Sequence, residues 1–229
     1  MQRERVTENL IRLNRLRFVN AYLVREDDGF TLVDTAVGRS ADDLIAAARD
    51  AGGAIRRIAL THGHGDHVGS LDALRQRLGA EVQVLMPELD ARIDAGEHVV
   101  EGKLPGSWPR IETTPDVRLA GGERIGSLEV VPSPGHTPGH VAFLDTRDRA
   151  LLAGDTFTTV GGVAVSSHFT FPFPLATTAT WDRPLNLESA RTLRGLEPTL
   201  LTVGHGAPVR GPLEQMDAAI ERAARALGR

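Results

Sequence analysis

The chain has 229 residues, of which 41% are hydrophobic and 24% charged, a composition that predicts an ordinary folded protein with a sizeable core and excludes a disordered chain. The sequence contains no cysteine, which excludes disulfides, a cysteine nucleophile and thiolate ligands, so any metal must be held by nitrogen and oxygen. The net charge of −4 gives no reason to expect a nucleic-acid partner.

No targeting or membrane segment is expected from the sequence. The first residues are charged and lead into no uninterrupted apolar stretch, so a secretory signal is not predicted. No window approaches the ~18 consecutive apolar residues that a membrane span requires. We therefore expect a cytoplasmic protein that binds no membrane.

Strand and helix patterns alternate through the first half of the chain. Residues 18–24 and 30–34 are predicted strands, and the Asp28-Gly29 pair between them predicts a hairpin. Ser40 opens a capping-box pattern, which predicts a helix that ends at Gly52-Gly53. The remaining predicted elements are a strand at 55–60, a helix that presents Leu71, Leu74 and Leu78 on one face, and a strand at 82–86.

The second half repeats this alternation after a glycine- and proline-rich stretch at 96–115. The predicted strands are 123–125, 128–131, 140–145, 150–153 and 200–203, and the predicted helices are 186–194 and 213–227. No linker separates the two halves. The pattern therefore predicts a single α/β (α+β) domain over residues 1–229 that contains two sheets.

One short segment concentrates side chains that bind metals. His62, His64, Asp66 and His67 lie within six residues, directly after the predicted strand 55–60. In a loop that leaves a strand, the first two histidines can turn to one side while Asp66 and His67, entering a helix, turn to another. One loop can then serve two metal positions, and its two glycines let the backbone fold tightly. The spacing differs from the helical i, i+4 histidine pair of zinc proteases.

Three further candidate ligands lie in the second half of the chain. They are His136, Asp155 and His205, and each follows or lies between predicted strands in a turn marked by glycine. A pocket at the strand ends would collect these residues together with the histidine-rich loop. The two groups together supply enough ligands for two metal sites.

These segments together resemble the metallo-β-lactamase superfamily of hydrolases. The resemblance begins with Asn20-Ala21-Tyr22-Leu23-Val24 and Leu32-Val33-Asp34-Thr35, which precede the metal-binding segments in the expected order. It implies a four-layer αββα sandwich with the metals at one edge between the sheets. Because Asp155 offers a bridging carboxylate, the chain looks more like the glyoxalase II, lactonase and phosphodiesterase branches than like the true β-lactamases.

The resemblance also implies how the ligands divide between two divalent metal ions. The ligands of one metal would be His62, His64 and His136, and those of the other would be Asp66, His67 and His205. Asp155 would bridge the two ions. An imidazole-rich set favours zinc, with iron or manganese as the alternatives.

The implied reaction is hydrolysis by a hydroxide that the two metals share. Two divalent ions ~3.5–4 Å apart shift the pKa of bound water from ~15.7 toward ~7. This shift corresponds to about 12 kcal/mol at ~1.4 kcal/mol per pKa unit. Asp66 keeps an uncoordinated carboxylate oxygen in this arrangement, so its catalytic role would be to orient the hydroxide or to carry its proton to the leaving group.

Several polar residues outside the two ligand sets have other interpretations. His140 follows His136 by four residues, and support of a metal ligand is favoured over direct ligation. Asp34 either caps a turn after its strand or contacts the metal-binding loop. His98 is interpreted as an ordinary surface residue.

The two predicted substrate-pocket loops are residues 87–116 and 156–185. Within the second loop, the apolar run Phe169–Leu175 either covers the metals as a lid or packs as ordinary core or as a homodimer contact. His168 and Trp181 lie near this run in the sequence, and Trp108 is a candidate for the opposite wall. An apolar wall suits an acyl chain or a lactone better than a nucleotide.

The leading hypothesis is a metal-dependent hydrolase of a small ester, thioester or lactone. One alternative on the same fold is an iron-dependent sulfur dioxygenase, with one metal held by His62, His136 and Asp155. Phosphodiesterase activity and a non-catalytic binding role are further alternatives. Tyr22 is the single tyrosine, which weakens the resemblance to acyl-homoserine lactonases because these enzymes typically place a tyrosine hydroxyl near the carbonyl oxygen.

Overall fold

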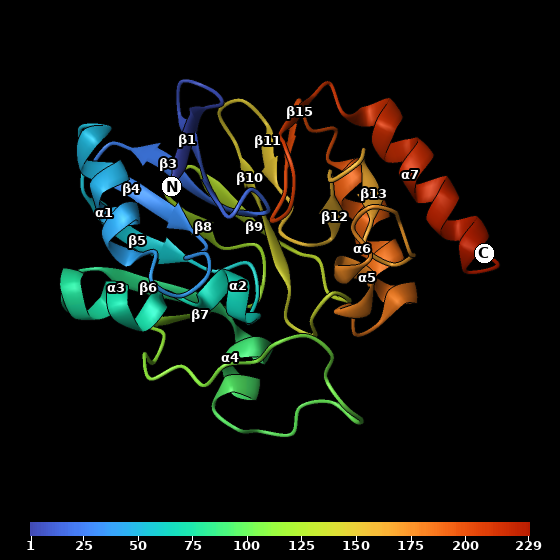
Figure 1. The fold of residues 1–229 in the computed structure, drawn as a ribbon, viewed down its shortest axis with the longest axis horizontal. Coiled ribbons are helices and arrows are strands. Elements are labelled where there is room, and N and C mark those ends of the chain that lie inside the picture. The colour runs from blue at the N-terminus through green and yellow to red at the C-terminus, as the bar shows by residue number, and fades with distance from the viewer. The chain divides into compact units, whose positions relative to one another are not determined.

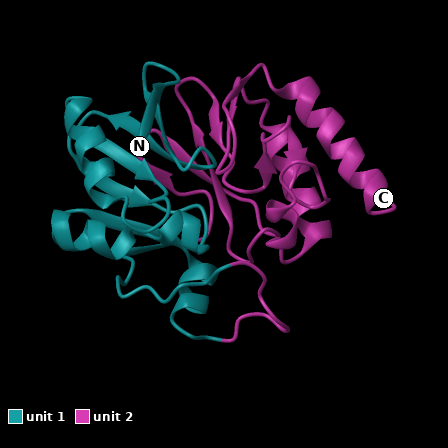
Figure 2. Cartoon of the chain, viewed as in Figure 1, with its two compact units in different colours: residues 1–97, 107–119 teal, residues 98–106, 120–229 magenta.

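The computed structural model describes residues 1–229, which form two compact units (Figure 1 and Figure 2). Unit 1 contains residues 1–97 and 107–119, and unit 2 contains residues 98–106 and 120–229. Each unit has its own sheet, helices and hydrophobic core. The predicted α/β class is confirmed, whereas the single domain over residues 1–229 and the two substrate-pocket loops stay predictions.

Unit 1 is built on a seven-stranded sheet in the order β1-β2-β3-β4-β5-β6-β7. The strands are β1 (Gln2–Arg5), β2 (Leu10–Arg15), β3 (Val19–Glu26), β4 (Gly29–Val33), β5 (Ile55–Ala59), β6 (Gln83–Pro87) and β7 (Val117–Leu119). The helices are α1 (Ala41–Asp50), α2 (Gly65–Val68), α3 (Leu71–Leu78) and α4 (Glu88–Asp94). Strands β1 to β4 pair antiparallel, and β4 to β7 pair parallel.

Helices α1 and α3 cover one face of this sheet (Figure 1). Leu44 of α1 and Leu74 of α3 are fully buried against strand residues such as Leu32 and Ile58. Each such side chain contributes roughly 1.5–3 kcal/mol when it leaves water. The apolar periodicity read from the sequence therefore identifies the face of each helix that packs on the sheet.

The start of α1 differs from the predicted capping box. The Ser40 side chain makes no capping hydrogen bond to the helix. Its hydroxyl instead donates to the Val37 carbonyl at 2.8 Å, and its backbone N–H donates to Ser70 Oγ at 2.9 Å. Ser40 therefore connects two turns of unit 1, a role that depends on tertiary contacts and is not encoded by the local pattern.

Unit 2 contains a six-stranded sheet in the order β15-β14-β11-β10-β9-β8 and a two-stranded sheet of β12 and β13. The strands are β8 (Arg124–Ile125), β9 (Leu128–Pro132), β10 (Val141–Asp145), β11 (Ala150–Leu152), β12 (Phe157–Thr158), β13 (Ala164–Val165), β14 (Leu200–Thr202) and β15 (Val209–Arg210). The helices are α5 (Leu175–Thr178), α6 (Arg183–Gly195) and α7 (Leu213–Ala226). No helix of the chain combines the length and apolarity needed to cross a membrane.

Helices α6 and α7 share one core with the larger sheet of unit 2. Leu187 and Leu193 of α6 and Met216 of α7 are fully buried in it. Helix α6 begins three residues earlier than predicted, because Asp182 caps it by accepting the Leu185 N–H at 2.9 Å. Proline is tolerated in the first helical turn, where backbone N–H groups have no partner within the helix.

In each unit, the strand directions bring the predicted ligand segments to the same end of the sheet, where the carboxyl ends of parallel strands lie. In unit 1, β4, β5 and β6 run parallel, so Asp34, the 61–67 loop and α4 all follow carboxyl ends of neighbouring strands. In unit 2, Leu152 pairs in parallel with Thr202, and Asp155 and His205 each follow three residues later. Strand β9 runs in the same direction as β11, so the turn that holds residue 136 leaves this end of the sheet too. Carboxyl ends of parallel strands are where open α/β sheets usually bind ligands.

Candidate metal centre

In unit 2, three predicted ligands meet at one carboxylate oxygen. His136 Nε2 lies 3.4 Å from Asp155 Oδ2, and His205 Nε2 lies 3.1 Å from the same atom. All three side chains are buried. Donor atoms around a tetrahedral zinc ion, with bonds of ~2.0–2.2 Å, lie roughly 3.3 Å apart. The spacing of these three donors therefore fits the ligands of a metal.

In unit 1, the other four predicted ligands lie together on the loop after β5 and on α2. A ligand atom of His62 lies within 4.8 Å of one from His64 and of one from His67. His67 Nε2 lies 4.0 Å from Asp66 Oδ2. The three histidines are buried, whereas the Asp66 side chain is 34% exposed. The loop thus presents an imidazole-rich donor set, which suits zinc or iron, with one carboxylate that solvent can reach.

Hydrogen bonds in unit 1 place the lone pairs of two histidines on Nε2. Asp34 Oδ2 accepts from His67 Nδ1 at 2.8 Å and from the Thr61 hydroxyl at 2.9 Å. Since the one hydroxyl hydrogen of Thr61 is directed to Asp34, its Oγ1 accepts from His62 Nδ1 at 3.0 Å. Metal-binding histidines ordinarily donate their other ring N–H in this way. Of the two interpretations of Asp34, contact with the metal-binding loop is therefore the one observed.

The same arrangement holds His136 in unit 2. The Thr180 hydroxyl lies within hydrogen-bond distance of two backbone carbonyls, those of Ser166 and Ala176, so its hydrogen is directed to them. Its oxygen therefore accepts from His136 Nδ1 at 3.0 Å, which leaves the lone pair of the ring on Nε2. Nothing in the local sequence around Thr180 indicates this role, because 44 positions separate the two residues.

His140 supports a predicted ligand through its backbone. Its Nε2 accepts the Asp155 backbone N–H at 3.0 Å, and its Nδ1 lies 2.9 Å from Ser133 Oγ. Since Nε2 accepts a hydrogen bond, the ring proton is on Nδ1 and is directed to Ser133. This arrangement matches the interpretation of His140 as a residue that orients a metal ligand.

Two residues that the sequence patterns did not connect with the loop hold it in place. Asp90 of α4 is fully buried, and its carboxylate accepts the Gly63 N–H at 2.8 Å. The Trp108 ring packs edge-on against the His64 ring at 5.1 Å between centroids. A Cβ at Gly63 would lie 2.6 Å from the Trp108 ring, so any side chain there would displace one of them. Glycine at this position therefore allows the loop to pass beneath the indole.

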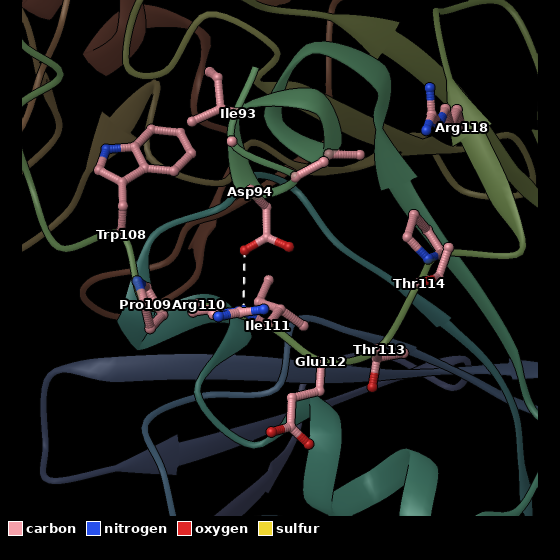
Figure 3. A pocket seen from close by; sticks show the side chains of 14 residues that line it. Ile93, Asp94, Trp108, Pro109, Arg110, Ile111, Glu112, Thr113, Thr114 and Arg118 are labelled. Carbon is pink, nitrogen blue, oxygen red and sulfur yellow. Dashed lines mark hydrogen bonds between the residues drawn. The ribbon is translucent and has the colours of Figure 1, made fainter. Parts of the chain in front are cut away.

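A cavity of about 520 Å³ lies in unit 1 beside Trp108 (Figure 3). Asp94 points into it and accepts the Ile111 N–H at 3.0 Å. Burial, together with the charge of Asp72, raises the pKa of Asp94. Arg118 lines the same cavity, so charges of both signs surround it. The cavity falls within the predicted substrate-pocket loop 87–116, whose role stays a prediction.

The remaining predicted residues lie as follows. His98 is exposed, in agreement with its interpretation as a surface residue. The Trp181 backbone N–H donates to the His136 carbonyl at 3.0 Å. In the apolar run, the Phe173 ring lies 5.0 Å from the His205 ring. His168 lines a cavity beside α7, and neither Phe173 nor His205 is among the residues that line this cavity.

Comparison with known proteins identifies the family. The family model described as "Metallo-beta-lactamase superfamily" matches residues 14–205. The chain is 43% identical to the uncharacterized protein YobT of Bacillus subtilis (strain 168) over 211 residues, which cover 90% of each chain. It is also 29% identical to the hydroxyacylglutathione hydrolase of Rhodopseudomonas palustris (strain BisA53), with 90% of this chain and 76% of that protein covered.

A solved structure agrees with these matches. The crystal structure of TTHA1623 in a di-iron-bound form superposes with a TM-score of 0.66 and 28% sequence identity, covering 89% of this chain and 94% of that one. The prediction of a metal-dependent hydrolase with this fold is thereby confirmed. On the family match over most of its length, the chain belongs to the metallo-beta-lactamase superfamily.

Proposed function

We propose that the chain is a dinuclear metal-dependent hydrolase of a small ester, thioester or lactone. The observation that carries the proposal is the convergence of His136 and His205 on a single oxygen of Asp155. A carboxylate that lies between two histidines from different ligand sets can be shared by two metals. The match to a protein named hydroxyacylglutathione hydrolase supports an acyl compound as substrate.

The residues divide between the metals as the family resemblance implies. One set would be His62, His64 and His136, the other would be Asp66, His67 and His205, and Asp155 would contribute to both. When bound, divalent metals lower the pKa of water and polarise the carbonyl oxygen of an ester. Zinc and iron are both candidates, and the di-iron form of TTHA1623 favours testing iron alongside zinc.

The chain's own side chains then hold and move protons. Asp34 and two threonine hydroxyls accept the Nδ1–H groups of three histidines, which leaves the Nε2 lone pairs of these rings to hold a metal. Asp66 is the most exposed of the carboxylates in the two sets, so it can exchange a proton with solvent and deliver it to the leaving oxygen or sulfur.

Removal of the metals is expected to abolish hydrolysis. We expect the chelated protein to lose at least about 100-fold in kcat/KM on esters, thioesters or lactones, because a water of pKa ~15.7 is then the nucleophile. Added zinc or iron should restore the activity. The measurement is a panel of these substrates together with bis-p-nitrophenyl phosphate, assayed with metal-loaded and chelated protein.

The same panel separates the alternatives. Turnover of the phosphate diester alone would contradict the proposal and favour a phosphodiesterase. One iron per chain with oxygen consumption and no hydrolysis would favour the sulfur dioxygenase. Equal activity of loaded and chelated protein would exclude a metal-dependent reaction of either kind.

A further inference from the structure

We infer that unit 2 carries a binding site for an amphipathic anion, with Arg222 as its charged contact. We further infer that this site takes the acyl part of the substrate, so that the favoured substrates carry an acidic group at the far end of an apolar chain. The second part rests on the proposed function, whereas the first part stands on the cavity itself.

The site is a cavity of about 550 Å³ that lies against α7 in unit 2. Helix α7 lines it with Gln215, Ala218 and Arg222, whose spacing of three and four residues puts them on one helix face. Its other walls are formed by residues 160–164 and by residues 168, 170 and 171. The volume lies in the usual range for small-molecule sites.

The charges that line this cavity favour an anion. None of its lining residues is acidic, although the protein as a whole carries a net charge of −4. Arg222 donates to the Val163 carbonyl at 2.8 Å and forms no ion pair with any carboxylate. His168 lies beside it, and its Nδ1 is buried with no hydrogen-bond partner. The guanidinium of Arg222 can therefore donate charge-assisted hydrogen bonds to an acidic ligand group.

The imidazole of His168 is neutral near pH 7. Burial is the larger cause that lowers its pKa, and the charge of Arg222 is the next. Arg222 is therefore the single full positive charge of the cavity. A ligand with one acidic group matches this arrangement better than a ligand with several.

The rest of the cavity favours a hydrocarbon chain. Val160, Val163, Ala164 and Ala218 line its walls. Phe171, which also lines it, is 94% exposed. Phe169 and Leu175 of the same segment are 60% and 64% exposed. Neighbouring apolar side chains left in water are typical of a surface that a ligand or partner covers, and a chain that enters this cavity would cover Phe171.

Residues adjacent to two walls of the cavity contact the predicted metal ligand His205. Its carbonyl accepts from the Thr159 N–H and from the Thr158 hydroxyl, each at 3.0 Å, and the wall 160–164 follows these residues directly. The other wall ends two residues before Phe173, whose ring lies 5.0 Å from the His205 ring. The segments that form the cavity walls thus continue into residues that contact His205, and this connection supports the inference that a ligand in the cavity is part of the substrate.

Direct binding tests the first part of the inference. Octanoate is the probe and octanamide its neutral counterpart, titrated calorimetrically into the full-length protein. We expect octanoate to bind about tenfold more tightly than octanamide, because a charge-assisted hydrogen bond is lost with the amide. Arg222→Gln should remove this preference, and Phe171→Ala should weaken both ligands. The matched control is Arg225→Gln on the same helix, whose side chain pairs with Glu221 outside the cavity and should change neither affinity.

Two esters of equal chain length test the second part. The mono-p-nitrophenyl ester of adipate ends in a carboxylate, and p-nitrophenyl hexanoate is its neutral counterpart. Arg222→Gln should raise KM about tenfold for the acidic ester with kcat little changed, and should leave the neutral ester unaffected. If neither ester is hydrolysed but octanoate binding depends on Arg222, the proposed function fails and the anion site stands. If the esters are hydrolysed and Arg222→Gln changes neither binding nor KM, the anion site is wrong.

Discussion

Replacing Asp155 by asparagine is expected to lower kcat/KM for the best substrate by at least about 10³-fold. The amide has the shape of the carboxylate but lacks the charge that offsets two metal ions, and it lies between His136 and His205 at donor distances of 3.4 and 3.1 Å. Loss of a residue that only orients a ligand costs about 10- to 100-fold, so loss of a shared ligand must cost more. Steady-state kinetics with saturating metal measures the effect.

The matched control for this variant is Asp148→Asn. Asp148 lies just before β11 and Asp155 just after it, so the two aspartates stand at opposite ends of one strand. Asp148 accepts the Ala150 N–H at 3.0 Å, a bond that an asparagine oxygen can keep. We expect wild-type kinetics for the control. Wild-type activity of Asp155→Asn with its full metal content would contradict the assigned role of the carboxylate.

Replacing Asp34 by asparagine is expected to weaken metal binding about 10- to 100-fold and to destabilise the protein by about 1–3 kcal/mol. Asp34 is buried and accepts from Thr61 and from His67 Nδ1. The single amide oxygen of asparagine can still accept from the Thr61 N–H. It cannot also accept both from the Thr61 hydroxyl and from His67 Nδ1. Its backbone has φ of 60°, a conformation that asparagine adopts readily, so the substitution isolates the loss of charge and acceptor.

Competition with a chromogenic chelator gives the metal affinity, and urea unfolding of the metal-free protein gives the stability. Asp27→Asn, in the exposed turn between β3 and β4 of the same unit, is the control for removal of a negative charge. An unchanged metal affinity in Asp34→Asn would show that the His67 ring needs no carboxylate to orient it. Equal destabilisation by both substitutions would assign the stability effect to net charge alone.

Local sequence signals predicted those elements whose burial is regular. The hairpin of β3 and β4 and the helices α1, α3 and α7 were predicted within a few residues, because apolar side chains recur at the strand or helix period. Strand β1 (Gln2–Arg5) was missed, since all four of its residues are exposed and it exists only through pairing with β2. The strands β12, β13 and β15 were missed for another reason, because two residues are too few to show the alternation of a strand.

The candidate site shows the same division between local and tertiary information. His62, His64, Asp66 and His67 stand in one motif, so the sequence alone brings them together. His136, Asp155 and His205 carry a weaker signal, a glycine-marked turn after a strand, and the family resemblance was needed to group them. Asp90 and Thr180 gave no signal at all. Each contacts the site by a hydrogen bond to a residue far away in the sequence, and no local pattern encodes such a contact.

The proposed function depends on the binding of two divalent ions by the seven predicted ligands of this chain. Anomalous diffraction at the zinc and iron absorption edges, from crystals of metal-loaded protein, tests it most directly. We expect two anomalous peaks per chain, both in contact with Asp155, each with three further ligands from one of the two sets. A single peak, or peaks that do not contact Asp155, would contradict the proposed function.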